Sequence, residues 1–152
     1  MNIQQVYKSI QELADPVLER YGYSSMGPTY VKKVSDGLYV FIHFEVSRDK
    51  TTYTVWAYPS SPKLNTTDQQ DFPAKHGNPL GNKSFLNAKL GVGKGASSFS
   101  CKTKNILQKT LSEHALPAIE QHAIPFLQQF HALPDILPFL ENSQWASFIT
   151  SA

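Results

Sequence analysis

The sequence predicts an α+β fold, with an N-terminal helix, an antiparallel meander of three to five strands, and C-terminal helices packed on one face of the sheet. Three observations predict this order. Apolar residues recur at intervals of three and four at the start of the chain, alternate with polar residues in the middle, and return to helical spacing after residue 103. The length of 152 residues suits one domain, and no linker or repeat divides it, so residues 1–152 are predicted to form a single domain.

The N-terminal helix is predicted from an apolar stripe that ends before Tyr21-Gly22. Pro16 lies within this stripe, and proline lacks an amide proton and disfavours a helical conformation at the preceding residue. We therefore expect a kink, or two short helices. The stripe consists of Ile3, Val6, Tyr7, Ile10, Leu13, Ala14, Val17 and Leu18.

Alternation of apolar and polar residues predicts three antiparallel strands. The first begins at Thr29 and leads into Asp36-Gly37, a dipeptide that suits a tight hairpin turn. The second covers residues 38–46, and the third covers residues 51–58. The second strand directs Leu38, Val40, Ile42, Phe44 and Val46 to the core, and Tyr39, Phe41, His43 and Glu45 to the opposite face.

Residues 59–83 contain four prolines and many Asn, Asp, Gln and Gly residues, which predicts a long exposed loop without a packed element. Residues 85–92 are predicted to form a further strand. Thr103 is expected to cap the next helical stripe, which Pro117 and Pro125 divide into two or three helices up to His131. Residues 135–141 are expected to form one more short helix. The stripe contains Ile106, Leu107, Leu111, Ala115, Ile119, Ala123, Phe126, Leu127 and Phe130.

Cysteine content and hydropathy indicate the cellular compartment. Cys101 is the only cysteine, which excludes an internal disulfide, and its simplest role is that of a small buried thiol. Charged residues interrupt the first twenty positions, which therefore lack the apolar run of a signal peptide. Nowhere do eighteen apolar residues run together. We expect a cytoplasmic protein that does not enter a membrane.

The sequence contains no motif for catalysis, metal binding or cofactor binding. The glycines around Lys94 suggest a phosphate-binding loop, but Ala88 stands where that loop needs glycine, and Gly95 where it needs Ser or Thr. None of the five histidines, at positions 43, 76, 114, 122 and 131, has a partner at the helical spacing of metal ligands. No catalytic residue, metal or cofactor is therefore predicted.

The face of the second strand that carries His43 and Glu45 allows an alternative, a small-ligand-binding or enzymatic domain that uses an aromatic sheet face. A simple hydrogen-bonded pair explains these two residues better than a catalytic dyad does. The aromatic residues of the three strands could stack nucleic-acid bases, but few basic residues lie among them, so packing is favoured. These aromatic residues are Tyr30, Tyr39, Phe41, Tyr53, Trp56 and Tyr58.

Charge is distributed unevenly along the chain. Residues 72–112 carry seven lysines and no acidic residue, whereas residues 113–152 carry four acidic residues and no lysine or arginine. The lysines can attract phosphate or an acidic protein surface, and the acidic part would repel nucleic acid. A lysine-rich loop that serves solubility is the other interpretation.

The order of elements resembles a bacterial family of small α+β domains of unknown function. The resemblance depends on Tyr21-Gly22-Tyr23 before the first strand, Leu90-Gly91, the aromatic Phe99, and Ile124-Pro125-Phe126-Leu127 in the last long helix. It covers residues 18–30, 39–55 and 89–130. Some domains of this kind resemble immunity proteins encoded beside polymorphic toxins, which implies a protein partner and no established catalytic residues.

These observations together predict a non-catalytic protein-binding domain, and the resemblance implies an immunity protein that neutralises a cognate toxin. Two surfaces are candidates for the partner, because charged surfaces give fast and selective association. A partner with a basic cleft would bind the acidic residues Glu113, Glu120, Asp135 and Glu141. A partner with an acidic surface would bind the lysines, among them Lys89, Lys94, Lys102 and Lys104.

Overall fold

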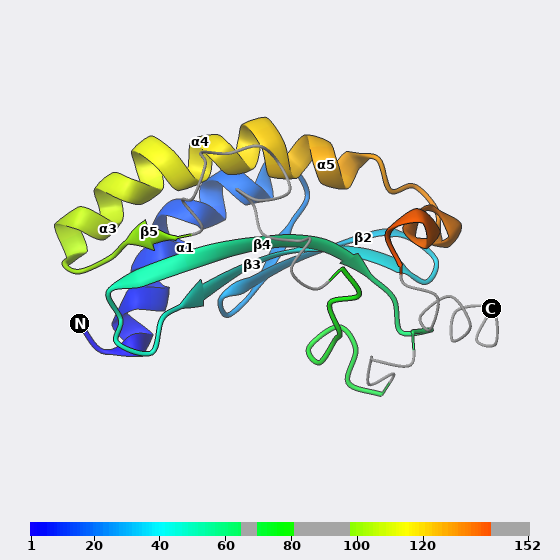
Figure 1. Cartoon of the computed structure of the whole chain (residues 1–152), viewed down its shortest axis with the longest axis horizontal. Coiled ribbons are helices and arrows are strands. Elements are labelled where there is room, and N and C mark those ends of the chain that lie inside the picture. The colour runs from blue at the N-terminus through cyan, green and yellow to red at the C-terminus, as the bar shows by residue number, and fades with distance from the viewer. Residues whose placement is uncertain (65–69, 81–97, 141–152) are drawn as a thin grey trace.

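The computed structural model describes residues 1–64, 70–80 and 98–140. In this part of the chain the helices lie on one face of an antiparallel sheet (Figure 1), which confirms the predicted α+β fold. The sheet has the order β1-β2-β3-β4-β5, the same as the order along the chain. Its strands are β1 Ser24–Met26, β2 Thr29–Ser35, β3 Leu38–Val46, β4 Thr52–Ser60 and β5 Phe99–Ser100.

The predicted hairpin connects β2 and β3. Gly37 in its turn has a φ of 77°, a conformation that glycine adopts without steric cost. The predicted second and third strands correspond to β3 and β4, whose register pairs Phe41 with Tyr58. The edge strands β1 and β5 were not predicted, because segments of two or three residues show too little alternation to be recognised.

Helix α1 (Ile3–Glu19) is one uninterrupted helix that contains Pro16, so of the two alternatives expected there, a kink or two short helices, the second was wrong. Asn2 caps its first turn in a reciprocal arrangement with Gln5. Pro16 removes only one backbone hydrogen bond, and the buried Ala14 and Leu18 hold the helix to the core on both sides of it. The helix ends at Glu19, and the turn that follows it contains Gly22, whose φ of 88° glycine adopts without steric cost.

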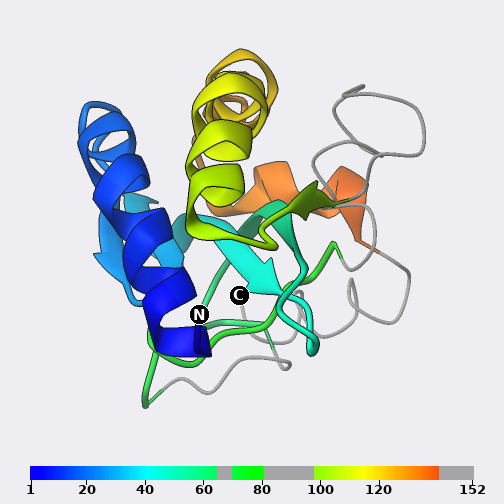
Figure 2. The ribbon, with the colours of Figure 1, turned by 90° about the vertical axis from the view of Figure 1, so that its left-hand side faces the viewer.

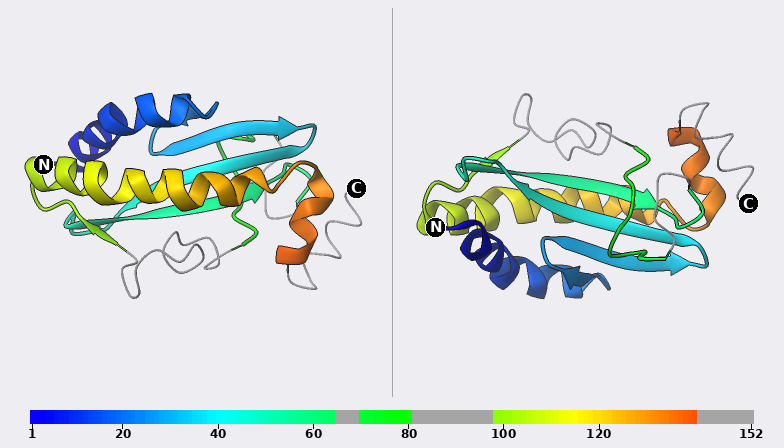
Figure 3. Two further views of the ribbon diagram at one scale, coloured as in Figure 1. Left: turned by 90° about the horizontal axis from the view of Figure 1, so that it is seen from above. Right: turned by 90° about the horizontal axis from the view of Figure 1, so that it is seen from below.

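A second, longer helical run crosses the sheet from Lys104 to Gln128. Thr103 caps it as predicted, because its side chain accepts a hydrogen bond from the backbone N–H of Ile106 at 3.2 Å. Contrary to prediction, Pro117 and Pro125 do not divide it, and Figures 1 and 3 show one continuous rod. Its pieces are α3 Lys104–Thr110, the π-helical turn η2 Leu111–Ala115, α4 Leu116–Ala118, the π-helical turn η3 Ile119–Ala123 and α5 Ile124–Gln128.

The last described element is the 3₁₀ helix η4 (Leu133–Phe139). It begins two residues before the short helix that was predicted from residue 135. Leu133 and Ile136 are buried, so this turn extends the core beyond the end of α5.

The main core lies between the sheet and the helices, and Figure 2 shows α1 and the longer run side by side over the sheet. The prediction for β3 is confirmed, since Leu38, Val40, Ile42 and Phe44 all belong to this core. Cys101 is a buried free thiol, as expected. Ile106 of the predicted stripe is instead 37% exposed.

The opposite face of the sheet carries a second hydrophobic cluster built on Phe41, Tyr58 and Leu80. Residues 70–80, which we call the covering segment, lie across the strands on this face (Figure 3). The prediction of an exposed loop over residues 59–83 was therefore wrong in part: Ser60 and Ser61 are fully buried, and Leu64 and Leu80 are nearly so. The predicted strand at 85–92 lies outside the described residues.

Candidate functional site

Three separate segments meet at one end of the molecule, beside the N-terminus in Figure 1 and facing the viewer in Figure 2. They are the start of α1, the turn between β3 and β4, and the residues leading into α3. The backbone N–H of Cys101 donates to the carbonyl of Thr51 at 2.8 Å, and that of Val46 donates to the hydroxyl of Tyr7 at 3.4 Å. These contacts bring basic residues from all three segments together.

We call this surface the basic end and define it by five exposed side chains: Lys8, Arg48, Lys50, Lys102 and Lys104. Among the described residues of these segments, Glu12 and Asp49 are the acidic ones, so the formal charge is plus three. Lys8 and Lys104 line the same shallow hollow between α1 and α3, together with Glu12. A positive surface of this kind attracts acidic partners.

The turn that presents Arg48 and Lys50 is held by its own hydrogen bonds. The Asp49 carboxylate accepts from the hydroxyls of Ser47 and Thr51, each at 2.7 Å, and from the Thr51 backbone at 3.1 Å. These bonds lower the pKa of Asp49 to about 2, so the carboxylate stays ionised and the turn stays closed at neutral pH. Arg48 and Lys50 therefore project from a preformed turn.

Two of the four lysines predicted as a partner site belong to the basic end. Lys102 and Lys104 lie at the basic end, whereas Lys89 and Lys94 lie outside the described residues. The contributions of Lys8, Arg48 and Lys50 were missed, because these residues belong to segments distant in sequence. The only signal for two of them was the charged hairpin turn at residues 48–50.

Two of the four acidic candidates are bound within the molecule. Glu120 accepts a hydrogen bond from the Tyr21 hydroxyl at 2.7 Å and lies 3.7 Å from the Arg20 guanidinium. Asp135 accepts from the backbone N–H groups of His131 and Ala132, which lowers its pKa. Glu113 is exposed, and Glu141 lies outside the described residues. The acidic surface is thus less available than its sequence suggested.

The chain was compared with models of protein families, with curated proteins and with solved structures, and no significant match was found. Function is therefore inferred from the surface chemistry of the chain itself.

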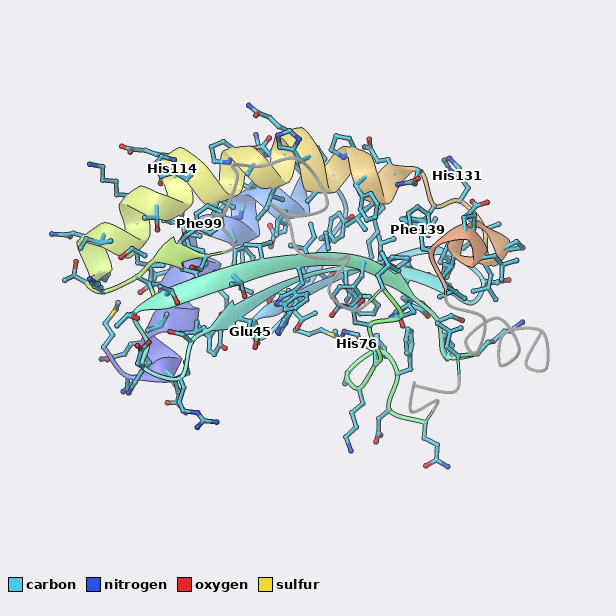
Figure 4. The ribbon with its side chains drawn as sticks, in the orientation of Figure 1. Glu45, His76, Phe99, His114, His131 and Phe139 are labelled. Atoms are coloured by element: carbon cyan, nitrogen blue, oxygen red, sulfur yellow. The ribbon has the colours of Figure 1, made fainter. Side chains whose placement is uncertain are left out.

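His43 and Glu45 share the sheet face opposite the helices, where Figure 4 shows Glu45 and His76 beneath the sheet. Their side chains have different partners. The Nδ1 atom of His43 lies 2.7 Å from the Thr29 hydroxyl, and Glu45 accepts from the Trp56 indole N–H at 2.8 Å. Burial lowers the pKa of His43. Both residues are thus engaged in structural hydrogen bonds rather than with each other.

The six aromatic residues considered for base stacking lie on both faces of the sheet. Tyr30 and Tyr53 are fully buried in the main core, whereas Phe41 and Tyr58 belong to the cluster under the covering segment. A platform for consecutive bases needs its rings on one accessible face. The six rings therefore form no such platform, and they act in packing.

Two further properties concern the described ranges 1–64, 70–80 and 98–140. No three His, Cys, Asp or Glu side chains of these ranges come together in a way that could hold a metal ion. No helix within them is both long enough and apolar enough to cross a bilayer.

Proposed function

We propose that this protein is a non-catalytic protein-binding domain whose basic end docks on an acidic surface of its partner. The observation that supports this proposal is the meeting of five exposed basic side chains from three segments. Clustered charge of one sign accelerates association and selects partners of opposite charge. The preformed turn at Asp49 adds rigidity, so less freedom is lost on binding.

The choice of the basic end over the acidic residues follows from their internal contacts. Glu120 and Asp135 would have to give up hydrogen bonds to Tyr21 and to the backbone of η4 before they could bind a partner. The lysines of the basic end form no ion pair within the described part of the chain. Binding through the basic end therefore leaves the fold unchanged.

The partner we propose is a bacterial toxin, with this chain as its cytoplasmic immunity protein. The support for this finer proposal is the resemblance carried by residues 18–30, 39–55 and 89–130. An immunity protein needs a stable surface that covers the toxin and no chemistry of its own. An acidic surface near the toxin's active site would fit the basic end.

Co-expression with the protein encoded immediately upstream tests this function. We expect a stoichiometric complex that survives purification, relief of toxicity, and an association rate that falls with added salt, because salt screens exposed charges. Exchange of Lys102 and Lys104 for Glu should slow association by about tenfold or more at low salt.

Exchange of Lys33 and Lys63 for Glu is the matched control. It changes the net charge equally, but Lys63 lies against Gly37 in the hairpin turn of β2 and β3, away from the basic end. This control should bind as the unaltered protein does. If both double variants slowed association equally, the basic end would not be the binding surface. If the protein encoded upstream formed no complex with this chain, the proposal would be rejected. Salt-sensitive gel shifts with nucleic acid would instead indicate a nucleic-acid partner.

A further inference from the structure

A cleft lies on the helix side of the sheet, between β2 and β3 and the end of α5, with a volume of about 240 Å³. Its floor is apolar. Val40, Leu127 and Phe130 line it, and each is at most 2% exposed. These residues belong to the main core, so the floor is held in place by the fold. The cleft therefore has a preformed but narrow apolar floor, because these residues expose little of their surface.

The rim of the cleft carries hydrogen-bond donors, chief among them Lys32 and Tyr23. The Lys32 ammonium lies 5.9 Å from the centre of the Tyr23 ring, and within the described ranges no carboxylate lies within 4.0 Å of it. The Tyr23 side chain is only 5% exposed, yet its hydroxyl makes no hydrogen bond to the described residues. Burial raises the pKa of Tyr23, which keeps this hydroxyl protonated. The half-buried Lys32 ammonium and the Tyr23 hydroxyl, which reaches solvent at the rim, are thus both without a partner among the described residues.

The carboxylates near the cleft are already bonded, and the side chains of Gln128 and His131 also line it. Asp36 pairs with Lys33 at 3.5 Å, and Asp135 accepts from the backbone N–H groups of His131 and Ala132. The carbonyl groups at the two nearby helix ends are also occupied. Tyr23 N–H bonds to the carbonyl of Leu18, and Phe130 N–H bonds to that of Leu127. What remains is a donor-rich rim over an apolar floor.

We propose that this cleft binds a small organic monocarboxylate, with its apolar body on Val40, Leu127 and Phe130 and its carboxylate at Lys32 and Tyr23. A carboxylate accepts charge-assisted hydrogen bonds from an ammonium and a hydroxyl together. The volume is below the roughly 300 Å³ at which pockets for drug-sized molecules begin, so the ligand has about one ring or a short chain. This site is separate from the basic end and does not depend on the proposed partner.

Titration of the full chain with 3-phenylpropanoate, followed by two-dimensional ¹⁵N–¹H NMR, tests the proposal. The neutral 3-phenylpropanamide is the matched probe, because it has the same apolar body without the charge. We expect amide shifts around Val40 and Leu127 with the acid, and at least about tenfold weaker binding of the amide. Equal affinity for both probes, or shifts elsewhere only, would overturn the assignment.

Variants separate the two rim donors from the floor. Lys32→Met should weaken binding of the acid by about tenfold and leave binding of the amide unchanged, because it removes the cation and keeps the apolar stem. Tyr23→Phe should have a smaller effect in the same direction. Lys63→Met, which removes a lysine that does not line the cleft, should bind as the unaltered protein does. Unchanged affinity of Lys32→Met for the acid would contradict the proposal even if Tyr23→Phe fails to fold.

Discussion

Two tyrosine hydroxyls tie α1 to its neighbours. Tyr30 of β2 donates to the carboxylate of Asp15, and Tyr21 donates to Glu120 of the longer helical run. Burial and the hydrogen bond to Asp15 both raise the pKa of Tyr30. Such bonds to charged groups have defined geometry, unlike apolar contacts. They therefore position α1 against the sheet and against the second helix.

His76 has the corresponding role on the opposite face. Its Nδ1 lies 2.9 Å from the carbonyl oxygen of Pro73, and its Nε2 lies 2.6 Å from the hydroxyl of Tyr58. A carbonyl only accepts, so Nδ1 carries the proton and Nε2 accepts from Tyr58. The ring also stacks on Phe41, with 3.9 Å between ring centres. The covering segment is held by a neutral histidine.

We predict that acidification weakens the fold through this histidine. Burial lowers the pKa of His76 and of His43 on the same face. Below about pH 6.5 the unfolded chain binds protons that the folded chain resists, so the free energy of unfolding falls as the pH decreases. Chemical denaturation at about pH 7.5 and about pH 5 measures this fall.

Two Gln variants identify the histidine responsible. In His76→Gln the free energy of unfolding should fall less on acidification than in the unaltered protein, since His43 is then the only histidine of the two on this face. His114→Gln, at an exposed position of the helical run, should keep the full fall. Stability that is constant or increases over this interval would contradict the explanation.

The longer helical run shows how a helix accommodates internal prolines. The N–H of Leu116 bonds to the carbonyl of Leu111, and that of Ile124 bonds to the carbonyl of Ile119, so each wide turn ends directly before a proline. In a regular helix a proline ring crowds the carbonyl four residues earlier. Widening the preceding turn relieves this contact and keeps the run continuous.

The covering segment consists of coil and turns, yet it packs like a core element. Phe72 makes edge-to-face contacts with Tyr39 and Phe41, at ring distances of 4.7 and 6.0 Å. Leu80 completes the cluster and is 4% exposed. The segment thus shields the sheet face that the helices leave uncovered.

We predict that Leu80→Ala lowers the free energy of unfolding by about 2–4 kcal/mol, because it leaves a cavity beside Phe41 and Tyr58. Denaturant unfolding measures the loss. Ala74→Ser, at an exposed position of the same segment, should change the free energy of unfolding by at most about 0.5 kcal/mol. A loss for Leu80→Ala as small as that of the control would mean that the segment does not contribute to the core.

Across the whole molecule, β3 and β4 belong to both hydrophobic clusters, since alternate residues of each strand point to opposite faces. We therefore predict that the two clusters unfold together. Trp56 packs against the second cluster, so its fluorescence in a Trp145→Phe background reports on that face, and far-UV circular dichroism reports on the helices. The two denaturation curves should coincide. A fluorescence transition at lower denaturant would show that the covered face opens independently.

Spacing along the chain was sufficient to predict the fold class, the hairpin at Gly37, the Thr103 cap and the two faces of β3, because each depends on contacts within a few residues. The packing of residues 70–80, the basic end and the Lys32 cleft could not be predicted in this way. Each of these three features joins segments that are distant in the chain, and the local spacing of residues carries no information about which distant surfaces come into contact. Glu120 shows the same limit. Its charge is evident from the sequence, but only the folded chain brings Tyr21 and Arg20 close enough to bind its carboxylate.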